Sequence, residues 1–223
     1  MIQTSTIQFL NHLKKNNSKP WFDAHRTIYE AAKEDFLGFI SRVIQKLSTT
    51  ETALADQNAK DCIFRINRDV RFTKNKSPYK TNFGASIKLG GKKSDFAGFY
   101  FHLEPGESFV GGGLWMPRAE QLAKLHQEID YNFSDFKKII SSKAFTSCYG
   151  SLVSDPAQSL KRVPKGYEAN HPAANYLKMK SFIAQISLTD KELKNPGLLP
   201  KVLHAFLVLK PLIDFLNVPL MEE

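Results

Sequence analysis

Cysteine is scarce in this chain. Only Cys62 and Cys148 occur among 223 residues, which excludes a disulfide framework and a thiolate zinc site. Two unpaired thiols are typical of a reducing compartment, so we expect a cytoplasmic protein. Long apolar runs are also missing, since the longest, Val202 to Leu209, contains His204 and is too short to cross a bilayer. The first ten residues show no signal-peptide pattern, and we expect no membrane partner.

Acidic residues are outnumbered, and the shortage is local. The chain has 31 Lys and Arg against 22 Asp and Glu, a formal net charge of +9. Between Lys60 and Lys93 there are ten basic and two acidic residues, which is +8, and the remainder has 21 and 20, which is +1. Charge concentrated in this way is informative about partners rather than about fold. It favours an anionic partner for this window.

Hydrophobic periodicity predicts helices at both ends of the chain. Apolar residues recur at helical spacing over 6–15 and 18–47, then again over 117–130, 134–142 and from Leu199 onward. Ser18 is a candidate N-cap with Pro20 in the first turn, and Pro211 is expected to kink or break the last helix. A helical turn is expected over 173–178.

Alternation of apolar and polar residues predicts strands in the middle of the chain. The expected strands cover 62–72, 82–89, 97–104 and 108–115, joined by short turns, with a further strand over 182–188. Helices, then strands, then helices are typical of an α+β fold. We therefore predict a single α+β domain over residues 1–223, with an antiparallel meander of about four to six strands packed by N-terminal and C-terminal helices.

The segment from Ile63 to Lys88 is the main candidate site. It reads as strand, turn and strand, and its polar residues are candidates for binding a phosphate or carboxylate through charge-assisted hydrogen bonds. The candidate ligand-binding residues are Arg65, Arg68, Asp69, Arg71, Lys74, Lys76, Tyr79 and Lys80. Asp69 would orient an arginine, and its pKa should be lowered by its basic neighbours. The alternative is an ordinary surface pair of Asp69 and Arg71 among solvated lysines, which contributes little.

Arg68 stands between Ile66 and Val70, on the side of the first predicted strand that should face the core. An unpaired charge there is expensive. Two explanations stay open: a bulge turns Arg68 outward, or a carboxylate from a helix pairs with it in the interior.

Candidates for proton transfer are His102 and Tyr79. His102 lies between Tyr100 and Glu104 on one face of the third predicted strand, and a neutral histidine beside a carboxylate can act as a general base. A structural hydrogen-bonding role is the alternative. The other face of that strand, with Phe99 and Phe101, reads as core rather than as an open RNA-binding surface.

No metal or nucleotide cofactor motif is present in the sequence. The six histidines show no paired metal-ligand spacing. Gly111-Gly112-Gly113 lacks the Gly-Lys-Ser/Thr that follows in a phosphate-binding loop. A bulge or a close approach of two backbones explains this glycine run better.

Several motifs follow one another along the chain. One runs from Arg68 to Lys80, and a second comprises 98–108 followed by Gly111-Gly112-Gly113-Leu114-Trp115. A third is Pro164-Lys165-Gly166-Tyr167 with His171-Pro172, and Trp21-Phe22 stands near the start. In this order they resemble the motifs of one family, known as domain of unknown function 2461, in which the first of them is the central motif. Thr73 and Asn75 depart from the expected serine and aspartate. The resemblance implies a single-domain cytoplasmic protein of no assigned activity, whose distinctive residues coincide with the cationic segment.

Three functions remain open at this level. The first is a module that binds a phosphate-bearing ligand, either a nucleotide or a nucleic acid. The second is an enzyme on a small anionic substrate, with an Arg and Lys anion clamp and His102 or Tyr79 moving protons. The third is a structural or interaction protein in which the central motif serves the fold. The sequence indicates neither a reaction nor an oligomeric state.

Overall fold

The computed structural model describes residues 1–221 and confirms the α+β class. The strands are β1 (Phe83–Lys88), β2 (Gly98–Leu103), β3 (Ser108–Leu114) and β4 (Phe182–Leu188), and they form one antiparallel sheet in the order β1-β2-β3-β4. The helices are α1 (Thr4–Lys15), α2 (Lys19–Ala24), α3 (Arg26–Leu47), α4 (Ala59–Cys62), α5 (Ala119–Tyr131), α6 (Phe133–Ile140), α7 (Lys143–Tyr149), α8 (Ala174–Leu177), α9 (Asp190–Leu193) and α10 (Leu198–Met221).

The first predicted strand is the main error of the sequence analysis. Residues 62–72 form no strand, and the segment pairs with the following chain only through the bridges Ile63–Ala85 and Asn67–Tyr79. The two bridges are four positions apart along one side of the arm, from Ile63 to Asn67, and six positions apart along the other, from Tyr79 to Ala85, so the register shifts between them. The predicted apolar face also fails, because Phe72 is 92% exposed while Ile66 is buried. The alternation of apolar and polar residues extends to Phe72, whereas burial of the apolar side chains does not extend that far.

The helices agree with prediction apart from three details. The helix predicted over 18–47 is two helices, since His25 leaves helical geometry with a φ of −111° and its ring stacks on Trp21 at 4.1 Å. Helices α4, α7 and α9 were not predicted. Helix α10 contains Pro211 and Pro219 and is not broken by either. Neighbouring apolar side chains on α10 are buried, and this packing outweighs the lost backbone hydrogen bonds.

The residues described divide into two compact units. Unit 1 comprises 1–92, 100–110 and 187–204, and unit 2 comprises 93–99, 111–186 and 205–223, of which 222–223 lie outside the described range. Strands β2, β3 and β4 therefore contribute residues to both units. The expectation of a single domain stays a prediction.

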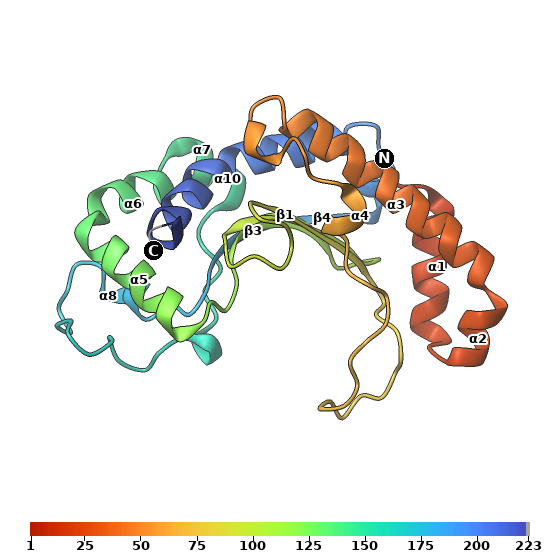
Figure 1. The fold of residues 1–223 in the computed structure, drawn as a ribbon, viewed down its shortest axis with the longest axis horizontal. Helices are drawn as coiled ribbons and strands as arrows, with labels where there is room; N and C mark the ends of the chain where they lie inside the picture. The colour runs from red at the N-terminus through yellow and green to blue at the C-terminus, as the bar shows by residue number, and fades with distance from the viewer. Residues whose placement is uncertain (222–223) are drawn as a thin grey trace. The chain divides into compact units, whose positions relative to one another are not determined.

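Unit 1 has an aromatic core between its N-terminal helices and the sheet. Phe36 and Phe39 of α3 contact Phe101 of β2 at centroid distances of 6.1 and 5.1 Å. Phe36 also stacks on Phe83 of β1 at 5.3 Å. All of these rings are buried, which confirms that Phe101 belongs to the core. In Figure 1, α1 and α2 lie beside α3 at the N-terminal end of this unit.

Unit 2 contains the glycine run of β3 and most of the last helix, α10. A Cβ at Gly111 would lie 2.1 Å from the carbonyl oxygen of Ala184, and one at Gly112 would lie 2.2 Å from that of Gly98. These are close backbone approaches, as the glycine run predicted. Phe206 of α10 packs on Phe99 at 4.8 Å, so Phe99 is core as well.

Helix α10 is long and apolar enough, by length and composition, to cross a membrane, and it alone meets that test within residues 1–221. In the structure, 56% of the most apolar 18-residue stretch of α10 is buried inside the protein. The core helix of a globular protein meets the same criteria. The expectation of a cytoplasmic protein without a membrane partner stays a prediction.

Candidate functional site

The candidate site lies on the segment between α4 and β1, which we call the arm and define as residues 63–82. Figure 1 shows it as an orange-yellow segment that extends away from α4 and β1 and then returns. Near its base the chain pairs with itself: Arg68 donates its backbone N–H to Pro78 (2.9 Å), and Lys80 donates to Ile66 (2.8 Å). Two short-range bonds close the tip, since Lys76 Nζ donates to the Val70 carbonyl (2.9 Å) and the Ser77 amide to Asn75 Oδ1 (2.9 Å).

Tyr79 anchors the arm to the loop after α1. The Asn17 side chain donates to the Tyr79 carbonyl and accepts from the Tyr79 amide, both at 3.0 Å. The Tyr79 ring stacks on Phe22 of α2, with centroids 4.0 Å apart and an interplanar angle of 14°. Tyr79 is buried, so its ring has a structural role whatever its hydroxyl does.

A polar pocket opens between the arm and the end of α1. It encloses about 390 Å³, and we call it the arm pocket. Its lining residues are Lys14, Asn17, Arg68, Asn75, Ser77, Tyr79, Lys80, Thr81 and Asn82. Three of them are cations and none is acidic. Lys14 meets Glu107 at 3.4 Å on an exposed surface, where such a pair is weak.

Arg68 and Lys80 are the uncompensated charges of the arm pocket. Both are half-buried, and neither side chain makes an ion pair or hydrogen bond with any residue in the described range 1–221. Burial, together with the nearby charge of Arg65, lowers the pKa of Lys80. Lys80 Nζ lies 5.5 Å from the ring centroid of Phe64. The prediction that an interior carboxylate pairs with Arg68 is wrong for residues 1–221, because the Arg68 side chain lines the arm pocket instead.

Arg71 and Asp69 form the pair that the sequence predicted. Arg71 Nε donates to Asp69 Oδ1 (3.0 Å) and Nη2 donates to Oδ2 (2.7 Å). The Arg71 amide adds a bond to Asp69 Oδ1 at 3.2 Å. The side-chain bonds and then the backbone bond lower the pKa of Asp69, as expected, and the same pair raises the pKa of Arg71. Both residues are exposed, and neither lines the arm pocket.

The predicted cationic surface is therefore divided. Arg68, Tyr79 and Lys80 line the arm pocket, whereas Arg65, Asp69, Arg71, Lys74 and Lys76 lie outside its lining. Arg65 and Lys74 are exposed and make no side-chain bond within residues 1–221. Lys14, Asn17, Asn75, Ser77, Thr81 and Asn82 were missed as site residues. Nothing in the sequence brings the end of α1 against a segment about sixty residues later, although the polar run Asn16-Asn17-Ser18 was visible as a helix end.

His102 belongs to a chain of hydrogen bonds that reaches the arm pocket. Its Nε2 lies 3.1 Å from Glu104 Oε2, and its Nδ1 lies 3.3 Å from the Tyr100 hydroxyl. Thr81, a pocket-lining residue, donates to Glu104 Oε1 at 2.6 Å. The His102 ring stacks on Phe109 at 4.7 Å. Burial raises the pKa of Tyr100 to about 12, so its hydroxyl stays protonated. With both ring nitrogens engaged, His102 can exchange a proton with a ligand only if one of these bonds opens.

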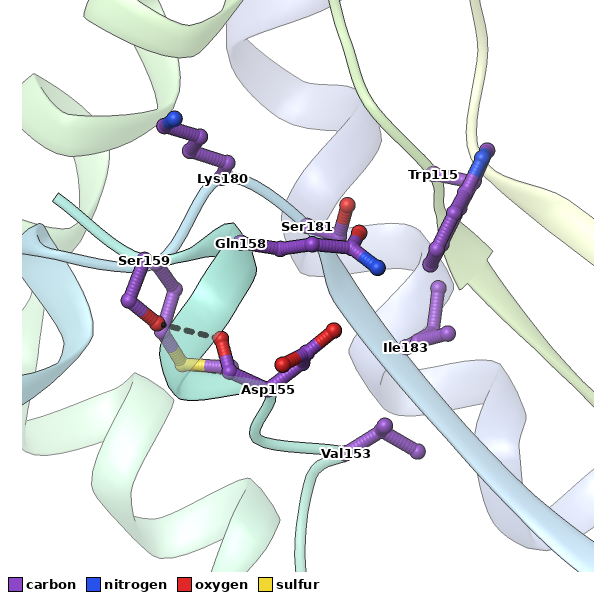
Figure 2. A pocket seen from close by; sticks show the side chains of 9 residues that line it. Trp115, Val153, Asp155, Gln158, Ser159, Lys180, Ser181 and Ile183 are labelled. Atoms are coloured by element: carbon purple, nitrogen blue, oxygen red, sulfur yellow. Dashed lines mark hydrogen bonds between the residues drawn. The ribbon is translucent and has the colours of Figure 1, made fainter.

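A second hollow lies in unit 2, beside β4. Figure 2 shows Trp115 and Ile183 along one side of it and Asp155 and Ser159 along the other, with Ser159 Oγ donating to the Asp155 carbonyl at 3.0 Å. Its volume is about 20 Å³, which is room for about one water molecule. It is too small to be the binding site of an organic ligand. Within residues 1–221, no group of three or more His, Cys, Asp or Glu side chains is placed to hold a metal ion.

Comparison with known proteins places this chain in a family. A family model described as "Conserved hypothetical protein (DUF2461)" matches residues 5–215. A search of the curated proteins found no match, and a search of the solved structures found none either. Since the family model covers nearly the whole chain, including the arm and the sheet, this chain belongs to the DUF2461 family of conserved hypothetical proteins.

Proposed function

We propose that the arm pocket binds a phosphate group of an anionic ligand, a nucleotide or a nucleic acid. The observation that supports this most directly is the placement of Arg68 and Lys80, two half-buried cations without acidic partners, on a pocket of about 390 Å³ whose lining contains no carboxylate. Partial burial strengthens their attraction for an anion because water screens them less. The amide and hydroxyl groups of Asn75, Ser77 and Asn82 supply further hydrogen-bond partners.

The free-energy cost of burying Arg68 and Lys80 without counter-ions favours a ligand-binding role over a purely structural one. A half-buried lysine without a counter-ion loses hydration that no opposite charge replaces. The lowered pKa of Lys80 is the sign of this unfavourable balance. An anion bound between Arg68 and Lys80 would supply the missing counter-ion for both side chains.

The test is calorimetric titration with inorganic phosphate, pyrophosphate and adenosine monophosphate. We expect saturable binding by the unmodified protein and at least about tenfold weaker binding by Arg68→Gln and by Lys80→Gln, because each removes a charged hydrogen-bond donor. Lys165→Gln, which removes one exposed positive charge elsewhere, is the matched control and should bind normally. Absence of binding to all three anions would overturn the proposal and favour a structural role for the central motif.

A second candidate is an enzyme on a small anionic substrate. It is favoured by Thr81, which lines the arm pocket and is linked through Glu104 to His102. Such a chain can relay a proton toward a substrate held by Arg68 and Lys80. In that case His102→Gln should abolish turnover of phosphate esters while phosphate binding persists. If the unmodified protein turns over no phosphate ester that it binds, the binding function stands alone.

A further inference from the structure

The tip of the arm carries an isolated aromatic ring. Phe72 is 92% exposed, which is more than any other large apolar side chain in the part of the chain described, residues 1–221. A ring in this position contributes nothing to a hydrophobic core, and its exposure to water is unfavourable. Its neighbours Arg71 and Thr73 are polar, so it does not belong to a wider apolar surface.

The ring lies in a strongly cationic setting. The Arg71 guanidinium carbon is 5.4 Å from the Phe72 ring centroid, and Arg71 is itself held by Asp69. Between Arg65 and Lys80 the chain has six basic residues and one acidic residue, which is +5. An exposed ring beside an arginine plane, among cations that lack acids, is the combination with which proteins bind the bases and phosphates of single strands.

We infer that the arm binds single-stranded nucleic acid, with one base stacked on Phe72 and the neighbouring phosphates bound by the arm's cations. The inference rests on the proposed function, because a phosphate of the strand would occupy the arm pocket, and it adds the base as a second recognised group. The bases of a duplex are stacked on one another, so a ring on a narrow arm can reach only an unpaired base. Every base has a π-face, and binding should therefore depend little on sequence.

An anionic membrane surface is the other partner that attracts cations and an aromatic side chain. Stable attachment to a bilayer requires a broad apolar face or two membrane-binding signals. The arm has one fully exposed ring, and Val70 is half-buried. The observations therefore favour nucleic acid, and vesicle binding becomes an outcome of the test.

The experiment measures fluorescence anisotropy of a labelled oligothymidylate of about ten nucleotides, a length suited to a single binding site. The matched probe is an abasic oligonucleotide of equal length, which has the same phosphates and no bases. We expect the unmodified protein to bind the oligothymidylate about tenfold more tightly than the abasic probe. Phe72→Ala should remove this difference, and Phe72→Trp should keep it. Tyr131→Ala, which removes another exposed ring, is the control and should change nothing.

The possible failures can be told apart. Equal affinity of Phe72→Ala and the unmodified protein for oligothymidylate overturns the inference and leaves phosphate binding in the arm pocket intact. Loss of binding to both probes in Arg68→Gln, with Phe72→Ala affecting only the probe with bases, supports both proposals. Co-sedimentation with phosphatidylserine vesicles that Phe72→Ala abolishes, without a difference between the two oligonucleotides, overturns the inference in favour of a membrane surface.

Discussion

The side chain of Asn17 forms both of its hydrogen bonds with the backbone of Tyr79, 62 residues later in the chain. The amide thus occupies the place that a neighbouring strand would take. Because residues 63–82 lack a continuous ladder, this contact and the Tyr79–Phe22 stack hold the base of the arm. The shape of the arm pocket depends on it.

Asn17→Ala should loosen the arm. Two bonds are lost, and the backbone groups of Tyr79 are left without partners, so we expect a loss of about 1–3 kcal/mol in the free energy of unfolding. Urea denaturation measures this. Trypsin should also cut at Arg68 and Arg71 faster than in the unmodified protein. Asn16→Ala removes one exposed bond to His12 and should be nearly silent. Equal stability of the two variants would contradict the anchoring role.

Lys80→Met should stabilise the protein while weakening phosphate binding. The substitution keeps the aliphatic packing and removes a charge that burial disfavours, for a gain of about 0.5–1 kcal/mol at neutral pH. Lys74→Met, at an exposed position, should leave the stability unchanged. Thermal unfolding compares them. A destabilised Lys80→Met would show that the charge has a partner in the native protein.

The same lysine predicts a pH dependence. Its folded pKa is lowered below the ordinary value of 10.5, so between these two values the unfolded chain binds more protons than the folded one. Stability contributed by this group therefore rises as the pH increases through that window. Phosphate affinity should move in the opposite direction, because only protonated Lys80 attracts the anion. The Lys80→Met variant should lose both dependences, as seen in denaturation and titration series over pH.

Thr81→Val should destabilise unit 1 modestly. It removes the hydroxyl that donates to Glu104 and keeps the side-chain shape, so the carboxylate loses one partner at a cost of about 1–2 kcal/mol. A double-mutant cycle with Glu104→Gln checks it, and we expect coupling of about 0.5–2 kcal/mol between the two positions. Additive effects would mean that Thr81 and Glu104 do not interact in solution.

Gly111→Ala should be strongly destabilising. The new Cβ would lie 2.1 Å from the Ala184 carbonyl oxygen, which is backbone and can move only with β4. We expect a loss of about 3 kcal/mol or more, as for other overpacked sites. Gly38→Ala in α3 meets only Arg42 Nη1, at 3.7 Å, and should instead stabilise by about 0.5–1 kcal/mol through helix propensity. Circular dichroism during thermal unfolding distinguishes the two.

Sequence patterns were sufficient for the strands of the sheet and for most of the helices, and insufficient for the arm. Alternation located β1, β2, β3 and β4, because each has one buried face against a core. The same alternation over 62–72 predicted a strand that does not form. Past Ile66 the apolar side chains of this segment are no longer fully buried, since Val70 is half-buried and Phe72 is left in water.

The predicted candidate residues match the lining of the arm pocket only in part. Charge density alone identified residues 63–88, and the spacing of Asp69 and Arg71 predicted their pair. The grouping of Arg68 with Lys14 and Asn17 could not be predicted, since it depends on where α1 ends relative to a segment far along the chain.

The amino-acid order by itself determined the class of the protein, most of its secondary structure and the concentration of positive charge. These depend on neighbours a few residues apart, whose spacing can be read directly. Only the tertiary structure decided which charges converge on a pocket and that one aromatic ring stays in solvent. Those outcomes depend on contacts between distant segments, and local periodicity contains no information about them.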